Sequence, residues 1–293
     1  MTSDVNADIN PGRAVIDVDM ARLRREQPGL FPGWLAARDL FAWSAGAALL
    51  AVVAMWALDF SFARIFNGLG RLLDFTQIML PPATDGKAMV FLEAMAETLA
   101  MAFLGTATAA LIAFPLGFLA ARNVIPNVFA HFAVRRSIDV VRGVDILIWA
   151  LLWVNVVGLG PFAGVLAIAC SDVGSFGKLF SEAIENIDRR PVEGVTSAGG
   201  SALHVQRYAV LPQVLPVIGS QVLYFFESNT RSASILGIVG AGGIGIYLTD
   251  NIRVLNLPVV TFIVVLILVA VVVIDFISEK LRRALIGRTG RQR

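Results

Sequence analysis

The strongest constraint on the fold is a series of long apolar runs separated by short charged stretches. The clearest runs are Phe41 to Leu58, Glu97 to Ala121, Leu147 to Val157, Phe162 to Cys170, Val214 to Phe226 and Val259 to Ile274. A helix that crosses a bilayer needs about 20 mostly apolar residues. Charged residues make up only 16% of the chain, against about 25% in soluble domains. The pattern predicts an all-α membrane protein with about six spans, five to seven being compatible with the runs.

The boundaries of the middle spans depend on a short break, the sequence G-L-G-P at Gly158 to Pro161. We interpret the two runs that meet there as helices joined by a tight turn. The first is expected to extend back to about Asp139 and the second forward to about Phe180. The fifth run is compatible with a helix that continues past Arg231.

Lysine and arginine gather near both ends of the chain, which favours a cytoplasmic position for both termini and an even number of spans. With six spans, the basic loops 122–136 and 178–207 lie on the cytoplasmic side and 59–93 lies outside. Residues 1–40 lack the apolar stretch of a signal peptide and are expected to form a cytoplasmic arm. Residues 281–293 are expected to form a basic cytoplasmic tail. These positive charges flank spans and form no separate basic domain, which argues against nucleic-acid binding.

A polar, small-residue stretch from Glu193 to Pro212 interrupts the apolar runs. Pro191 suits the first turn of a helix, where its missing N–H needs no partner, and Glu193 is expected in the same turn, near the positive end of the helix dipole. The Gly199-Gly200 pair is expected to end this helix, and Ser201 can cap a second one. The sequence predicts a helix, a glycine break and a second helix that Pro212 interrupts.

This stretch resembles the cytoplasmic coupling loop of bacterial ABC-importer permeases, whose pattern is E-A-A-x3-G-x9-I-x-L-P. The residues on that spacing are Glu193, Gly199, Leu211 and Pro212, and those that depart from it are Gly194, Val195 and Ala209. The resemblance implies contact with a separate ATPase. The coupling residues that it implies are Glu193, Gly199, Ser201, Arg207, Leu211 and Pro212. The alternative is an ordinary amphipathic cytoplasmic loop.

A wider stretch, from about Glu97 to Lys280, resembles the permease subunit of phosphonate- and phosphate-type ABC importers. The stretches that carry the resemblance are 158–167, 177–188, 210–216 and 226–245. It implies a type I importer (MetI-like) fold, with a first transmembrane helix and external loop over 41–92 and the permease domain over 93–280, its coupling loop at 188–212. The chain departs from the family at Val144-Asp145, where Pro-Glu is usual.

The resemblance implies a non-catalytic subunit that carries phosphonate, phosphate or a related phosphorus oxyanion across a bacterial inner membrane. The implied partners are a second copy of the chain, an ABC ATPase homodimer and an extracytoplasmic solute-binding protein. ATP and Mg²⁺ would be bound by the ATPase, since neither Gly86-Lys87 nor Gly177-Lys178 has the residues of a phosphate-binding loop. The alternatives are the same architecture with another solute, such as an amino acid, and an ion-coupled secondary transporter, which the lack of internal repeats disfavours.

A glycine-rich segment is open to three interpretations. Gly240, Gly242 and Gly245 form G-x-G-x-x-G, a spacing found in dinucleotide-binding loops. That motif needs a βαβ unit and an acidic residue about 20 residues later, and here an apolar run follows instead. These glycines, with Gly243, are expected to allow a bent or re-entrant backbone at the outer end of the pathway, the alternative being a plain exposed turn.

Ionisable residues inside spans are costly and are therefore functional candidates. Glu227 and Arg231 share a helix face and can pair, as Arg142 can with Asp139 or Asp145; alternatively the arginines attract an anion in transit. The candidate pathway residues are Arg142, Asp145, Glu227, Asn229, Arg231, Gly240, Gly242 and Gly243. Asp172 and Asp275 are expected near solvated helix ends. His131, His204 and Cys170 are too dispersed to suggest a metal site.

Overall fold

The computed structural model describes residues 34–124 and 128–289, and every regular element within them is a helix. The expected N-terminal arm, apart from its last residues, and the extreme end of the basic tail lie outside the described residues. Contacts divide the chain into one unit that ends at Leu72 and a second that begins at Leu73. Each unit is described by itself.

The first unit contains α2 (Trp34–Ala57) and the beginning of α3 (Phe62–Met79). Helix α2 covers the first apolar run. The chain bends by 57° between the two helices, next to Asp59, which adopts a left-handed backbone with φ of 49°. Helix α3 occupies part of the stretch that the sequence assigned to an external loop. Its arginines lower the hydropathy of the stretch, and hydropathy alone therefore did not reveal a helix.

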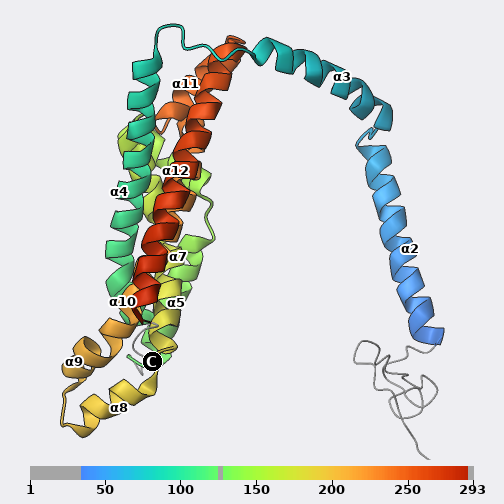
Figure 1. Cartoon of the computed structure of the whole chain (residues 1–293). Helices are drawn as coiled ribbons and strands as arrows, with labels where there is room; N and C mark the ends of the chain where they lie inside the picture. Colours follow the sequence, from blue (N-terminus) through green and yellow to red (C-terminus); the bar gives the residue numbers. More distant parts are fainter. Residues whose placement is uncertain (1–33, 125–127, 290–293) are drawn as a thin grey trace, which may run out of the picture. The chain divides into compact units, whose positions relative to one another are not determined.

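The second unit is a bundle of four long helices, α4 (Ala88–Ala120), α7 (Pro161–Glu185), α10 (Leu211–Leu236) and α12 (Leu257–Thr289). Helix α4 packs closely against α7, and α10 contacts α4, α7 and α12 (Figure 1). Small residues permit this approach, since a Cβ atom added at Gly105 of α4 would lie 2.6 Å from the Cβ atom of Ile168. Close packing at small residues is the usual basis of helix association in membranes.

A bent pair of helices packs against α7. Helix α5 (Val128–Arg142) and helix α6 (Ile146–Val157) meet at 83°. The expected continuous extension of this span back to Asp139 is therefore wrong. The side chain of Asp145 caps α6 by accepting a hydrogen bond from the N–H of Leu147, which starts a new helix at that point. Beyond α6, Gly158 and Gly160 have positive φ values of 92° and 138°, and this turn confirms the expected break.

The remaining elements lie at the two ends of the bundle. Helix α8 (Arg189–Ser197), helix α9 (Ala202–Val205) and the π-helix η2 (Gln206–Val210) project beyond α10 at one end. The 3-10 helix η3 (Gly237–Val239) and helix α11 (Ile244–Arg253) follow α10 toward the opposite end (Figure 1).

Within the described residues, four helical stretches are long and apolar enough to cross a membrane, or up to six if each bent pair counts as one span. The expectation of an all-α membrane fold is confirmed. The six spans inferred from hydropathy are the upper count, because two of them are bent pairs rather than single helices. Hydropathy windows register apolar length and do not register a bend.

Candidate functional site

Helix α8 begins at Arg189, slightly before Pro191, where the sequence suggested its start. The carboxylate of Asp188 accepts a hydrogen bond from the N–H of Arg190 at 3.0 Å and so caps the helix. Pro191 falls in the first turn, as expected. Glu193 does not, because the first turn is filled by the residues that directly follow Asp188, and that expectation is corrected.

The glycine break lies where the sequence predicted it. Helix α8 ends at Ser197, and Gly199 adopts a left-handed backbone with φ of 80°. The N–H of Gly200 closes the turn on the carbonyl of Val195 at 3.0 Å. Ser201 then caps α9, with its hydroxyl 2.9 Å from His204 Nδ1 and its backbone N–H 3.3 Å from the same nitrogen.

Pro212 does not interrupt the second helix, contrary to expectation. Residues 202–239 form one continuous helical stretch, and the proline occupies the first turn of its α10 segment. Proline cannot donate a hydrogen bond, and its ring would clash with the carbonyl four residues earlier in a regular α-helix. The π-turn of η2, in which the N–H of Leu211 donates to the carbonyl of Gln206, comes directly before it. The wider turn allows the helix to continue.

Gln213, in α10, joins that helix to the residue that caps α8. Its Oε1 atom accepts a hydrogen bond from the N–H of Asp188 at 3.0 Å, and its Nε2 atom lies 3.3 Å from the carbonyl oxygen of Asp188. The same Nε2 atom donates to the carbonyl of Ala209 at 2.7 Å. The sequence analysis did not identify Gln213, since a single glutamine within a helix carries no recognisable signal.

The exposed surface of α8, α9 and η2 has a flat part around Gly194 and protruding side chains at Leu203 and Tyr208. An added Cβ atom at Gly194 would meet nothing within 4 Å. The side chains of Leu203 and Tyr208 are 77% and 59% exposed, and the guanidinium of Arg207 lies 5.5 Å from the Tyr208 ring centre. Glu193 helps to line a hollow of about 280 Å³ between α8 and η2. Exposed apolar groups beside small residues are typical of a protein-binding surface.

The glycine-rich segment at the opposite end is buried rather than exposed. Gly240, Gly242 and Gly243 have positive φ values of 93°, 89° and 72°, and this confirms the expected bent backbone. A Cβ atom at Gly242 would lie 2.7 Å from the backbone nitrogen of Pro161, which begins α7. The alternative of a plain exposed turn is excluded. A dinucleotide-binding unit needs strands, and the part of the chain that the structure describes contains helices only.

Two side chains of α4 hold this glycine segment in place. The carboxylate of Glu97 accepts a hydrogen bond from the N–H of Gly243 at 3.3 Å, and the hydroxyl of Thr98 accepts one from the N–H of Ile244 at 2.9 Å. These bonds satisfy backbone donors at the start of α11 that its own turns cannot satisfy. The segment therefore links α4 to the turn between α6 and α7.

The ion pair expected between Glu227 and Arg231 is present, with a nitrogen–oxygen distance of 3.7 Å. Glu227 also has a closer partner, Arg282 of α12, at 2.9 Å. The sequence analysis had placed Arg282 in the cytoplasmic tail, whereas α12 continues through it. The side chain of Arg231 is 54% exposed and, at the longer distance, is the more weakly paired of the two arginines.

The other charged pathway candidates lie apart from this pair. Asp145 caps α6, and Arg142 is the last residue of α5 and lines a shallow hollow with Lys178 and Glu182. Neither acid proposed to pair with Arg142 does so within the described residues, since Asp139 pairs with Arg136 instead. The bend between α5 and α6 separates Asp145 from the face that a straight helix would have shared with Arg142.

A buried polar network joins α4, α7 and α10. The side-chain nitrogen of Asn229 donates to the hydroxyl of Thr106 at 2.8 Å and to the carboxylate of Asp172 at 2.5 Å. Asp172 is 5% exposed and lies in the middle of α7, and Asp275 lies inside α12. The expectation that both aspartates sit near solvated helix ends is wrong. The fourth apolar run stopped before Asp172 because a charged residue lowers hydropathy even where a partner satisfies it.

Comparison with known proteins gives consistent results. Residues 113–290 match the family described as binding-protein-dependent transport system inner membrane component. A phosphite transport system permease protein of Stutzerimonas stutzeri is 35% identical over 86% of this chain and 90% of its own length. A phosphate-import permease protein of Mycolicibacterium smegmatis is 38% identical over 80% of this chain and 44% of its own length.

The fold also matches a solved structure. An inward-facing form of the MetNI methionine ABC transporter gives a TM-score of 0.61 and covers 69% of this chain and 99% of the matched chain. At 20% sequence identity, that likeness establishes the fold alone.

Proposed function

Because the chain belongs to the family of binding-protein-dependent transport system inner membrane components, we propose that it is the permease subunit of an ATP-driven importer for a phosphorus oxyanion. The assignment of the cargo rests on the two relatives named for phosphite transport and phosphate import, at 35% and 38% identity. Phosphite, phosphate and phosphonates share a tetrahedral phosphorus with negatively charged oxygens. One pathway can therefore serve this class while a separate binding protein selects among its members.

The energy for transport comes from a separate ATPase, which binds ATP and Mg²⁺. The coupling unit, which we define as residues 188–213, offers that partner an exposed surface with Leu203 and Tyr208 at its rim. Gln213 ties the start of α8 to α10, so a force applied to α8 reaches a long helix of the bundle. Closure of the ATPase on ATP would push the unit, and the bundle would respond by opening outward.

We infer an assembly of two copies of this chain, two ATPase subunits and one extracytoplasmic binding protein in a bacterial inner membrane. One bundle supplies one wall of a pathway, and a second copy related by a two-fold axis encloses it. Leu285 near the end of α12 lies beside Gly219 at the beginning of α10, and so the described end of α12 reaches the end of the bundle that carries the coupling unit. This placement supports a cytoplasmic position for the C-terminus.

Arg231 is the best candidate for attracting the anion. Its side chain is exposed, and its acidic neighbour Glu227 is held more closely by Arg282. A half-free guanidinium on α10 can offer several N–H donors to an oxyanion, which is the geometry that arginine provides for phosphate groups. Glu227 and Asn229 would then hold this part of α10 in position.

Reconstitution in liposomes with the cognate ATPase and binding protein tests the proposal. Phosphite, phosphate and methylphosphonate are added singly, with methionine as the alternative cargo, and both uptake and ATP hydrolysis are measured. We expect at least one phosphorus oxyanion to stimulate hydrolysis and to accumulate inside. If methionine alone stimulated ATP hydrolysis, the assignment of a phosphorus oxyanion as cargo would be refuted. Uptake that needs no ATPase and stops when ion gradients are collapsed would refute the importer mechanism.

A further inference from the structure

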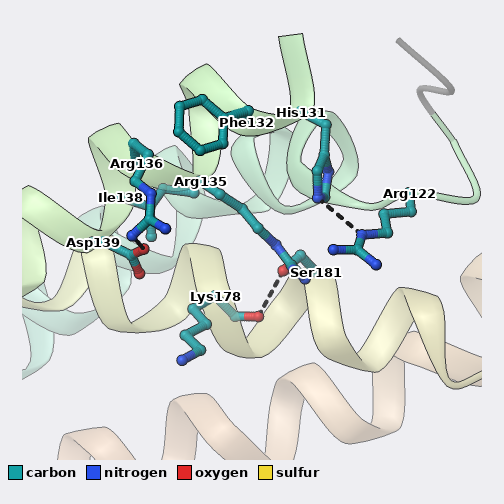
Figure 2. Close-up of a pocket in the computed structure, with 9 residues that line it drawn as sticks. All are labelled: Arg122, His131, Phe132, Arg135, Arg136, Ile138, Asp139, Lys178 and Ser181. Atoms are coloured by element: carbon teal, nitrogen blue, oxygen red, sulfur yellow. Dashed lines mark hydrogen bonds and ion pairs between the residues drawn. The ribbon is translucent and has the colours of Figure 1, made fainter. Parts of the chain in front are cut away.

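A basic pocket lies at the end of the bundle that carries the coupling unit, between α5, α7 and the residues that follow α4. It has a volume of about 260 Å³. Figure 2 shows its side chains converging from α5 and α7. The cationic residues that line it are Arg122, Arg135, Arg136 and Lys178, with Asp139 as the one acidic residue among the lining side chains. Positive charge therefore exceeds negative charge at its wall.

The pocket contains hydrogen-bond donors without partners. The Nε atom of Arg122 donates to His131 Nε2 at 3.2 Å, so that nitrogen must accept and the ring proton lies on Nδ1. His131 is 9% exposed, and its Nδ1 atom has no hydrogen-bond partner within the described part of the chain; the same holds for Nε of Arg135. Buried donors of this kind are normally satisfied, which indicates a missing acceptor.

The nearby carboxylates neutralise only part of this charge. Arg135 pairs with Glu185 at 3.0 Å, while Lys178 lies 4.0 Å from Glu182. The side chain of Arg122 has the neutral imidazole of His131, rather than a carboxylate, as its partner among the described residues. An anion with several oxygens would neutralise the excess positive charge and accept hydrogen bonds from the unpartnered donors.

Apolar surface adjoins the basic pocket. A second hollow, of about 320 Å³, lies along α5 and is lined by Leu116, Val134, Val141 and Val173 among others. Ile138 lines both hollows. Beside the basic pocket, the side chain of Phe132 is 59% exposed. Helix α5 is the first half of the bent pair that leads into the apolar α6, which places the pocket near the membrane surface.

We propose that this pocket binds the phosphate headgroup of an anionic phospholipid, with an acyl chain along the apolar hollow beside Ile138. Basic pockets between transmembrane helices on the cytoplasmic side are suited to such headgroups. The apolar hollow favours a lipid over free phosphate, which has no chain to place there. Because α5 packs on α7, and α7 leads directly to Asp188 and the coupling unit, a bound lipid would stabilise the base of that unit.

Native mass spectrometry tests this site. The protein is purified in detergent with equal amounts of phosphatidylglycerol and phosphatidylcholine, and the retained lipids are counted for the wild type and for Arg122→Gln/Arg136→Gln. Each cation near a headgroup contributes about 1 kcal/mol, so we expect the variant, which lacks two of them, to retain phosphatidylglycerol about thirtyfold more weakly. The control is Lys280→Gln/Arg283→Gln, which removes the same charge from α12, and it should retain lipid like the wild type.

Melting temperatures of the delipidated proteins identify the source of the bound phosphate. We expect phosphatidylglycerol to raise the melting temperature of the wild type and of the control, and inorganic phosphate to leave it unchanged. Equal lipid retention by the wild type and the pocket variant would overturn the proposal. Stabilisation by inorganic phosphate alone, lost in the pocket variant, would assign the pocket to free phosphate and would also overturn it.

Discussion

Asp188 and Gln213 are joined by two hydrogen bonds across the coupling unit, one in each direction. The N–H of Asp188 donates to Gln213 Oε1 at 3.0 Å, and Gln213 Nε2 lies 3.3 Å from the carbonyl oxygen of Asp188. The carboxylate of Asp188 caps α8 at the same time. One backbone position therefore starts α8 and fixes that helix to α10.

Replacing Gln213 with alanine should separate ATP hydrolysis from transport. The change removes the two bonds to Asp188 and the bond to the carbonyl of Ala209, and it leaves the exposed surface of α8 intact, so the ATPase should still bind. We expect substrate-stimulated ATP hydrolysis to persist while uptake per ATP falls by up to about thirtyfold, because the two hydrogen bonds that hold α8 to α10 are worth about 1 kcal/mol each. Both rates are measured in liposomes.

The matched variant for this experiment is Gln213→Glu. Its carboxylate can still accept from the N–H of Asp188 but can no longer donate to the carbonyl oxygens of Asp188 and Ala209. Coupling should therefore fall to an intermediate value. If the alanine and glutamate variants both transported as efficiently as the wild type, the bonds between Asp188 and Gln213 would have no part in coupling.

Substitutions at Gly194 should distinguish an effect on the stability of the fold from an effect on ATPase binding. Space around this glycine is open, and in the interior of α8 alanine favours the helix by about 0.5–1 kcal/mol. Gly194→Ala should therefore keep or slightly raise both stability and uptake. Gly194→Trp should melt like the wild type but lose ATPase binding, as measured by co-purification. Unchanged binding in the tryptophan variant would show that the partner does not approach this surface.

The long apolar runs predicted the class of fold well, because membrane spans are set by the length of apolar sequence. The bends were not predictable in the same way. Asp139, Arg142 and Asp145 read as charges on one helix, but Asp145 caps a new helix and Arg142 ends the preceding one. Capping depends on backbone direction, which hydropathy does not register.

The candidate site, like the fold, was predictable from the sequence only in part. The glycine break and the Ser201 cap were predictable because each depends on residues that are neighbours in the sequence. Gln213, Arg282 and Asp172 were missed or misplaced because their roles depend on partners from other helices. Asp172 became recognisable only when α7 and α10 brought it to Asn229.

Arg231 and Arg282 share the carboxylate of Glu227 but should behave differently when neutralised. Arg231→Gln removes an exposed, weakly paired side chain, so we expect normal melting and several-fold slower uptake of the oxyanion. Arg282→Gln leaves the largely buried Glu227 without its close partner and should destabilise the protein by about 1–3 kcal/mol. Normal uptake by Arg231→Gln would remove Arg231 from the pathway.

The contact between Asp172 and Asn229 should contribute measurably to stability. A double-mutant cycle with Asp172→Ala and Asn229→Ala isolates their interaction, for which we expect about 0.6–1.7 kcal/mol by comparison with other polar contacts in membrane helices. Unfolding in mixed detergent provides the free energies. Thr261→Ala is the control, since its hydroxyl donates only within its own helix, to the carbonyl of Leu257. A coupling energy near zero would show that the network has no role in holding α7 to α10.

Gly242 and Gly158 provide a matched pair for the glycine segment. Their φ values are 89° and 92°, in a range that L side chains rarely adopt, so alanine at either position meets backbone strain of about 1–3 kcal/mol. Only at Gly242 would the added Cβ atom also meet another segment, 2.7 Å from the nitrogen of Pro161, whereas at Gly158 it meets nothing within 4 Å. Overpacking costs typically about 1–3 kcal/mol, and Gly242→Ala should therefore melt well below Gly158→Ala. Equal melting of the two variants would mean that the segment moves away from α7 at little cost, as a gate at the outer end would require.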